Sequence, residues 1–241
     1  MKSRKVLLRV SGALLACVFG CLAWAQTQPA PAFLSSTIQM LQEFAARNAA
    51  QLRAYQWIET TTATVDGHTR PAQKSLCHFG PDGSLVRTPL DAQQNGSPQL
   101  KGGPVMRSIE RKKMDEIKEE MAQVHEVTAM YLPLNPDNLI QAVRTRQVGF
   151  EREPTGSTAV VLSNYAKQGD KVTFALDSTA RQIQSISVKT FLSSQNEPLS
   201  ITLQFSRLED GTVYPSITNI QAPSEQISIT TLSSDFSKPV Q

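Results

Sequence analysis

The chain has 241 residues, of which 40% are hydrophobic and 19% are charged. This composition supplies enough apolar material for one globular domain, with two domains as the upper bound. The formal net charge of +3 arises from the first 25 residues, which hold four of the 24 basic residues and none of the 21 acidic ones. The remainder has 20 basic residues against 21 acidic ones, so we expect no nucleic-acid partner, because phosphate backbones require a positive surface.

Residues 1–25 have the pattern of a secretory signal peptide. A basic start is followed by an apolar stretch from Val6 to Leu22 and by a small-residue cleavage motif that ends at Ala25. We therefore expect a periplasmic or extracellular protein, cleaved near Ala25, with no transmembrane span in the mature chain. A lipid anchor at Cys17 or Cys21 is the alternative. Simple secretion is preferred, because Phe19 fits poorly ahead of Cys21 and cleavage before Cys17 would leave a very short apolar core.

A single folded domain is predicted over 36–241, after a Pro-rich lead-in over 26–35. Its first helix should cover about 36–53, where Ser36 and Gln39 make a capping box ahead of apolar residues at three- and four-residue steps. Three strands of an antiparallel meander should follow. The turn sequences Asp66-Gly67 and Pro81-Asp82-Gly83 separate these strands, which are predicted at 57–65, 73–79 and 84–89.

A helical lid insertion is predicted over about 104–149, after a polar loop at 91–103. Pro104 is suited to the first turn of a long helix that stops before Pro133, and a shorter helix should begin at Pro136 and end before Gly149. The long helix carries one apolar stripe. Its members are Met106, Ile109, Met114, Ile117, Met121, Val124 and Met130.

The rest of the chain is predicted to be β structure. Runs rich in Val, Ile, Thr and Phe occur at 157–164, 171–176, 182–192, 198–208, 212–221 and 226–233. The alternation is clearest where Leu199, Ile201, Leu203 and Phe205 should form an apolar face. About nine strands without crossover helices predict an α+β fold, mainly antiparallel β, in which helices cover one face of a curled open sheet.

No catalytic or metal-binding motif is complete. His125-Glu126 begins like a zinc-protease motif, but the second histidine position is Ala129. Cys77 and His78 are consecutive on a predicted strand and point to opposite faces, so Cys77 is expected to be a core residue. We therefore expect no enzyme, no catalytic residues, no metal and no cofactor, with a hydrolase of unrecognised motif as a remote alternative.

The methionine stripe has two interpretations. Methionines on a helix over an apolar sheet either fill the core or line a space for a ligand of variable shape, such as an acyl chain. Both interpretations share one geometry and differ in whether the space stays open. The predicted ligand-binding residues are Met114, Ile117, Met121 and Val124 on the helix, with Leu203 and Phe205 opposite.

Several strand and turn sequences resemble those of the LolA-like superfamily, which includes outer-membrane lipoprotein carrier and sorting proteins. In the second half of the chain these are TFALD at 173–177 before Ile183, LQF at 203–205 and DGTVYP at 210–215. In the first half, YQW at 55–57 and FGPDG at 79–83 resemble exported bacterial proteins of that group. The resemblance covers most of the mature chain as an order of elements.

The resemblance implies an open, strongly curved half-barrel whose helices plug the concave side and leave a lipid-compatible space. The function that follows is non-enzymatic binding of a lipid, an acyl chain or a lipidated peptide. The alternative is an interaction or sensor module with a filled core, whose partner is another envelope protein. No individual binding residue is carried over from the family.

Overall fold

The computed structural model describes residues 51–90, 104–132, 136–145, 147–152, 158–177 and 182–239, together with Gln39, Asn48 and Ala50. The predicted signal peptide, the lead-in and the loop at 91–103 lie outside the described residues. Most of the first predicted helix also lies outside them. Its described members, Gln39, Asn48 and residues 50–52, are helical, as predicted.

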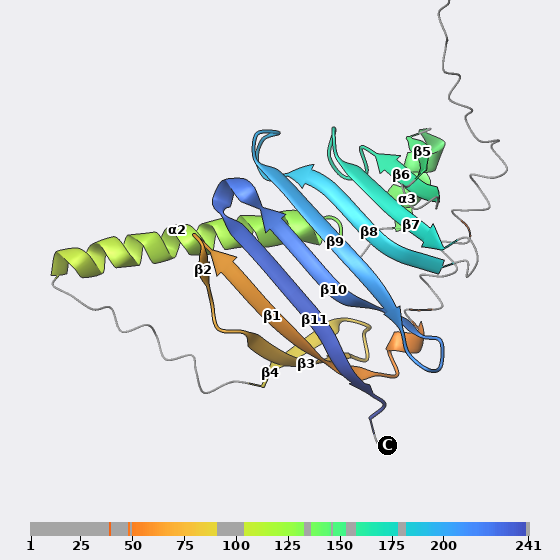
Figure 1. Cartoon of the computed structure of the whole chain (residues 1–241), viewed down its shortest axis with the longest axis horizontal. Coiled ribbons are helices and arrows are strands. Elements are labelled where there is room, and N and C mark those ends of the chain that lie inside the picture. Colours follow the sequence, from red (N-terminus) through yellow and green to blue (C-terminus); the bar gives the residue numbers. More distant parts are fainter. Residues whose placement is uncertain are drawn as a thin grey trace, which may run out of the picture.

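All strands belong to one antiparallel, open sheet of 11 strands (Figure 1). The order across the sheet is β4-β3-β1-β11-β10-β9-β8-β7-β6-β5, with the short β2 paired to β1. The strands are β1 Gln56–Val65, β2 His68–Thr69, β3 Gln73–Phe79, β4 Leu85–Pro89, β5 Val148–Arg152, β6 Thr158–Ser163, β7 Lys171–Asp177, β8 Gln182–Phe191, β9 Pro198–Arg207, β10 Val213–Ala222 and β11 Ile227–Ser237. The first and last strands of the order, β4 and β5, are its edges.

Each of the nine predicted strands is present within one to four residues of its expected ends. Two strands were not predicted. The two-residue β2 is too short to show a period, and β5 follows the second helix so closely that Gly149 was interpreted only as a helix stop. The predicted turn between β1 and β2 is confirmed, because Asp66 and Gly67 have φ values of 53° and 73°, as a two-residue hairpin turn of type I′ requires.

The long helix α2 spans Pro104–Ala129 and the shorter α3 spans Pro136–Arg144, both as predicted. α2 runs along the turns at one end of the sheet rather than along the strands (Figure 1). Lys113 forms an ion pair of 3.0 Å with Asp66 in the β1–β2 turn, and Gln123 donates a hydrogen bond to Ser193 after β8. A 3-10 turn, η1 Pro223–Glu225, joins β10 to β11 at the same end.

The core lies between the helices and one face of the sheet, which we call the inner face. Val124, Val127 and Tyr131 from the α2 region and Leu139 and Ala142 from α3 form one cluster with alternating strand residues. The predicted alternation in β9 is confirmed, since its apolar positions are buried or half-buried whereas its second half turns polar side chains outward. No helix in the described part of the chain is long and apolar enough to cross a membrane.

The side chain of Asn48 forms two hydrogen bonds with the backbone of the first residue of β10. The Asn48 amide donates to the carbonyl of Val213 and accepts a hydrogen bond of 2.7 Å from the Val213 N–H. Both backbone groups at the start of β10 are therefore satisfied, as a neighbouring strand would satisfy them.

A polar cluster joins three distant segments at the opposite end of the sheet from α2. The Tyr55 hydroxyl donates a hydrogen bond of 2.6 Å to Asp210, and Lys238 lies 3.4 Å from the same carboxylate. The hydrogen bond from Tyr55, followed by those from Thr212, holds the pKa of Asp210 well below its ordinary value of 3.8. A carboxylate with a lowered folded-state pKa contributes stability above its ordinary pKa and loses this contribution as the pH falls.

We expect the Asp210→Asn variant to be less stable than the wild type at pH 5.5, and the difference to narrow steadily below about pH 4. Urea midpoints measured at several pH values test this. Asp235→Asn is the matched control, since Asp235 is exposed and accepts a hydrogen bond from its neighbour Ser234. A difference for Asp210→Asn that stays constant down to pH 2 would contradict the assignment.

Candidate functional site

The inner face can be followed as rows of residues that lie opposite one another on neighbouring strands. One row is apolar throughout and runs Val148, Leu162, Val172, Val188, Ile201, Ile220, Ile229, Ala63. It lies one row farther from α2 than the buried residues Ala222, Ile227 and Val65. The next row becomes polar between β9 and β10, and runs Phe150, Val160, Phe174, Ile186, Leu203, Thr218, Thr231, Thr61. Residues directly opposite in antiparallel strands share a face, so these rows are continuous strips.

Burial follows the same direction. Val160, Phe174 and Ile186 are at most 2% exposed, whereas Ile220, Ile229 and the three threonines are only half-buried. In these two rows the inner face is therefore sealed over β6–β8 and accessible over β10, β11 and β1. Half-buried isoleucines beside half-buried threonines give a surface with an apolar and a polar part, which suits an amphiphile.

The structure places five of the six predicted ligand-binding residues in one apolar cluster or against it. Val124 and Leu203 are buried within the cluster, while Ile117, Met121 and Phe205 are half-buried at its margin. Met114 is half-buried one turn before Ile117. Met130, also assigned to the stripe, is 44% exposed after the end of α2, so the stripe continues through Val127 and Tyr131 instead.

The position of α2 locates the marginal residues over the sheet. Lys113 is anchored at the β1–β2 turn and Gln123 after β8, so Ile117 and Met121 lie on the stretch of α2 that passes the ends of β11 and β10. These are the two strands that carry Ile229 and Ile220. Ala222 and Ile227, at the adjacent ends of these strands, are buried, and the accessible apolar part of the inner face begins one row farther from α2.

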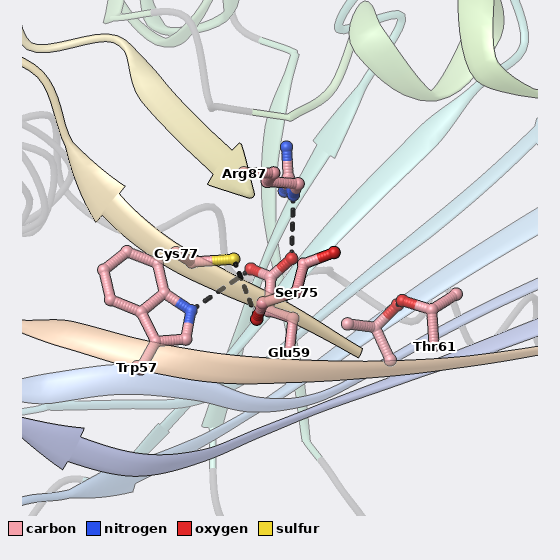
Figure 2. A network of polar contacts seen from close by, with 7 residues as sticks. Trp57, Glu59, Thr61, Ser75, Cys77 and Arg87 are labelled. Carbon is pink, nitrogen blue, oxygen red and sulfur yellow. Dashed lines mark hydrogen bonds and ion pairs between the residues drawn. The ribbon is translucent and has the colours of Figure 1, made fainter. Parts of the chain in front are cut away.

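A polar network on the same face was not predicted (Figure 2). Glu59 accepts a hydrogen bond of 2.8 Å from Arg87 Nε on β4 and one of 3.2 Å from the Trp57 indole N–H. The Trp57 ring stacks against Phe236 with ring centroids 5.5 Å apart. The Glu59 side chain is 12% exposed, so a charged pair lies on the inner face beside the threonines.

Cys77 belongs to this network, and its prediction as a core residue is confirmed because it is fully buried. Burial, followed by the neighbouring Glu59 carboxylate, raises the pKa of the Cys77 thiol to about 12. A thiol with this pKa has about a thousandfold less thiolate at pH 8 than an ordinary cysteine, and the thiolate is the reactive form.

We therefore expect iodoacetamide to leave Cys77 unmodified in the native protein and to modify it fully in denaturant. Peptide mapping by mass spectrometry after alkylation measures this directly. Modification of native Cys77 at the rate of a free thiol would contradict both its burial and the direction of its pKa shift.

A second buried network fixes the C-terminal end of α2. The Tyr131 hydroxyl donates a hydrogen bond of 2.7 Å to Asp170, and it lies 2.8 Å from the Thr190 hydroxyl. Asp170 also accepts the backbone N–H groups of three consecutive residues in the β6–β7 loop, Tyr165, Ala166 and Lys167. Burial raises the pKa of Tyr131, so this hydroxyl stays protonated as a donor. The network has a structural role, because its groups satisfy one another.

The residues considered for catalysis do not form a site. His125 and Glu126 are exposed on α2, and Cys77 and His78 occupy opposite faces of β3. Across the part of the chain that the structure describes, no three His, Cys, Asp or Glu residues are grouped so that they could hold a metal ion. The described part of the inner face is an amphiphilic surface.

The fold and inner face define an α+β protein with an open antiparallel sheet and helices packed on one face. Comparison with solved structures found similar chains. A DUF1329 family protein from Desulfovibrio piger has 9% identity and a TM-score of 0.43, with 86% of this chain and 93% of that one covered. No protein-family model matches the chain, and no curated protein matches it significantly.

Two further similar structures belong to the group that the sequence resembles. The domain of an outer membrane lipoprotein-sorting protein from Vibrio parahaemolyticus has 10% identity and a TM-score of 0.39, covering 85% of this chain and 92% of that one. A LolA superfamily protein from Nitrosomonas europaea has 10% identity and a TM-score of 0.35, covering 83% and 94%. These likenesses concern the fold alone.

Proposed function

We propose that this chain is an exported, non-enzymatic binding protein for a lipid, an acyl chain or a lipidated peptide, held between the inner face and α2. The observation that carries the proposal is the partial burial of Ile220 and Ile229, which continue a fully buried apolar row toward the open side of the sheet. An apolar chain placed on these residues would remove their remaining exposed surface from water, which is favourable.

The helix side of the proposed site consists of Ile117 and Met121, with Met114 one turn farther out. Methionine is flexible and polarisable, so it adapts to chains of different length and branching. Val124 and Leu203 are buried and support this surface from the core. Phe205, half-buried on β9, extends the apolar floor away from α2.

The resemblance of the sequence to carrier and sorting proteins agrees with this geometry. The signal-peptide pattern of residues 1–25 would direct the protein to the periplasm or the cell exterior, where acylated molecules need shielding in transit.

The proposal is tested by native mass spectrometry of the gently purified protein, with lipid extraction in parallel. We expect a bound amphiphile, or stoichiometric uptake of an apolar fluorescent probe that a long-chain alcohol displaces. The absence of both would overturn the proposal.

A second candidate, a protein-interaction module, is supported by the opposite face of the sheet. Ile58 pairs with Leu76 there, and Ile217 pairs with Leu232, which is 45% exposed. Exposed apolar groups of this kind mark many interaction surfaces. Substituting aspartate for Leu232 would abolish capture of an envelope partner in this case and leave amphiphile binding intact, whereas the first proposal predicts sensitivity at Met121.

A further inference from the structure

Glu59 and Arg87 are a charged pair on a face that is otherwise apolar or hydroxyl-bearing. Along the inner-face positions of β1, β3, β4, β10 and β11, defined by the strand register, these two side chains are the charged ones. The row that contains Arg87 continues through Cys77 to Trp57. A charged pair in this position has a cost in desolvation, so its placement calls for a physical explanation.

The carboxylate of Glu59 is already occupied. One oxygen accepts the Trp57 indole N–H and the other accepts Arg87 Nε. Cys77, the next neighbour, stays protonated because burial raises its pKa, so it adds no charge. Glu59 therefore acts as a fixed support for the guanidinium.

Arg87 is only partly used. Its contact with Glu59 runs through Nε, and within the described ranges no hydrogen-bond partner is found for its two Nη groups. The side chain is 55% exposed, and Figure 2 shows a guanidinium nitrogen turned away from the carboxylate. A guanidinium held at Nε presents its Nη donors in a planar arrangement that matches the oxygens of a carboxylate or a phosphate.

We propose that Arg87 binds the anionic head group, a carboxylate or phosphate, of the amphiphile, with Glu59 as its positioning residue. This inference rests on the proposed function, because it assigns the polar end of the same ligand. The acyl chain then crosses the threonine strip to Ile229 and Ile220, which lie in the next row toward α2. Glu59 and Ala63, which pairs with Ile229, are four residues apart on β1, about 14 Å, which a medium-length acyl chain spans.

The threonine strip suits the segment between head group and chain. Thr61 and Thr231 share a hydrogen bond of 3.0 Å, and Thr218 is directly opposite Thr231. Their methyl groups offer an apolar surface while their hydroxyls remain able to bond to ligand oxygens or water. A ligand lying across this strip passes from charged to polar to apolar surroundings in one direction.

The test measures the affinity of the full chain for dodecanoate, dodecyl phosphate and dodecanol by calorimetry at low salt. We expect Arg87→Gln to weaken binding of an anionic probe by about tenfold or more and to change dodecanol binding less than about twofold. The two anionic probes distinguish a carboxylate from a phosphate head group. Lys171→Gln is the matched control, since it removes another exposed ion pair, in which Lys171 Nζ lies 2.6 Å from Glu151 Oε1.

The Arg87→Gln variant leaves the Glu59 carboxylate unpaired, so the double variant Glu59→Gln/Arg87→Gln is measured beside it. Equal loss of anion binding in both variants supports a direct contact with Arg87. Unchanged affinity for the anionic probes in both, or an equal loss for dodecanol, would overturn the head-group assignment while leaving apolar binding in place. Failure of the wild type to bind any of the three probes would instead overturn the proposed function.

Discussion

The Met121→Asp variant is expected to lose affinity for an apolar probe by at least about tenfold while keeping its fold. Met121 is half-buried at the margin of the core, on the stretch of α2 that passes β10 and β11. A carboxylate introduced there can stay hydrated in the free protein but must lose water when an acyl chain covers it. Probe titration together with circular dichroism separates loss of binding from loss of structure.

Two other positions, one on α2 and one directly after it, calibrate this result. Met130→Asp places the same charge at a residue that is 44% exposed, so this variant should bind like the wild type. Val124→Asp places the charge at a residue that is 1% exposed, so this variant should fail to fold. If Met121→Asp unfolded as Val124→Asp does, Met121 would be a packing residue and the filled-core alternative would be favoured.

The Asp170→Asn variant is expected to be less stable than the wild type by about 3 kcal/mol. Asp170 is 2% exposed and accepts three backbone N–H groups and the Tyr131 hydroxyl. An amide in its place loses the charge and turns an NH₂ group toward one of these donors. For a chain of this size the loss corresponds to a melting temperature lower by about 6–12 °C, which calorimetry measures.

Glu197→Gln is the control for this variant. Glu197 also accepts two backbone N–H groups of a hairpin loop, from Ser193 and Ser194, but in a partly exposed position. Water can replace the lost interactions there, so the stability should fall by about 1 kcal/mol or less. Equal melting temperatures for Asp170→Asn and Glu197→Gln would show that burial does not increase the stability that the hydrogen bonds of Asp170 contribute.

The sequence was sufficient to predict the elements because their signals are local. The alternation in β9, the Asp66-Gly67 turn and the Pro104 and Pro136 helix starts each act within a few residues. These local signals do not specify the order of the strands in the sheet. β1 pairs with β11, about 170 residues away, and no local pattern specifies that partner.

The site was predicted in its apolar part only. The stripe on α2 identified Ile117, Met121 and Val124 by period, whereas Glu59 and Arg87 are 28 residues apart and meet through the register of three strands. A signal for this pair was present, since the predicted meander with its known turns places both residues on one face. Tyr131 and Asp170 gave no such signal, because a helix end and a loop meet there through tertiary packing.

The pairing of β1 with β11 has a consequence for how the chain reaches its native state. β11 lies between β10 and β1, so the amino-terminal meander cannot join the larger part of the sheet until residues 227–237 are available to pair with both. Closing so long a loop is entropically costly and slows folding. Removing residues 227–237 would leave two fragments of sheet, each with a newly unpaired strand, and such strands invite aggregation.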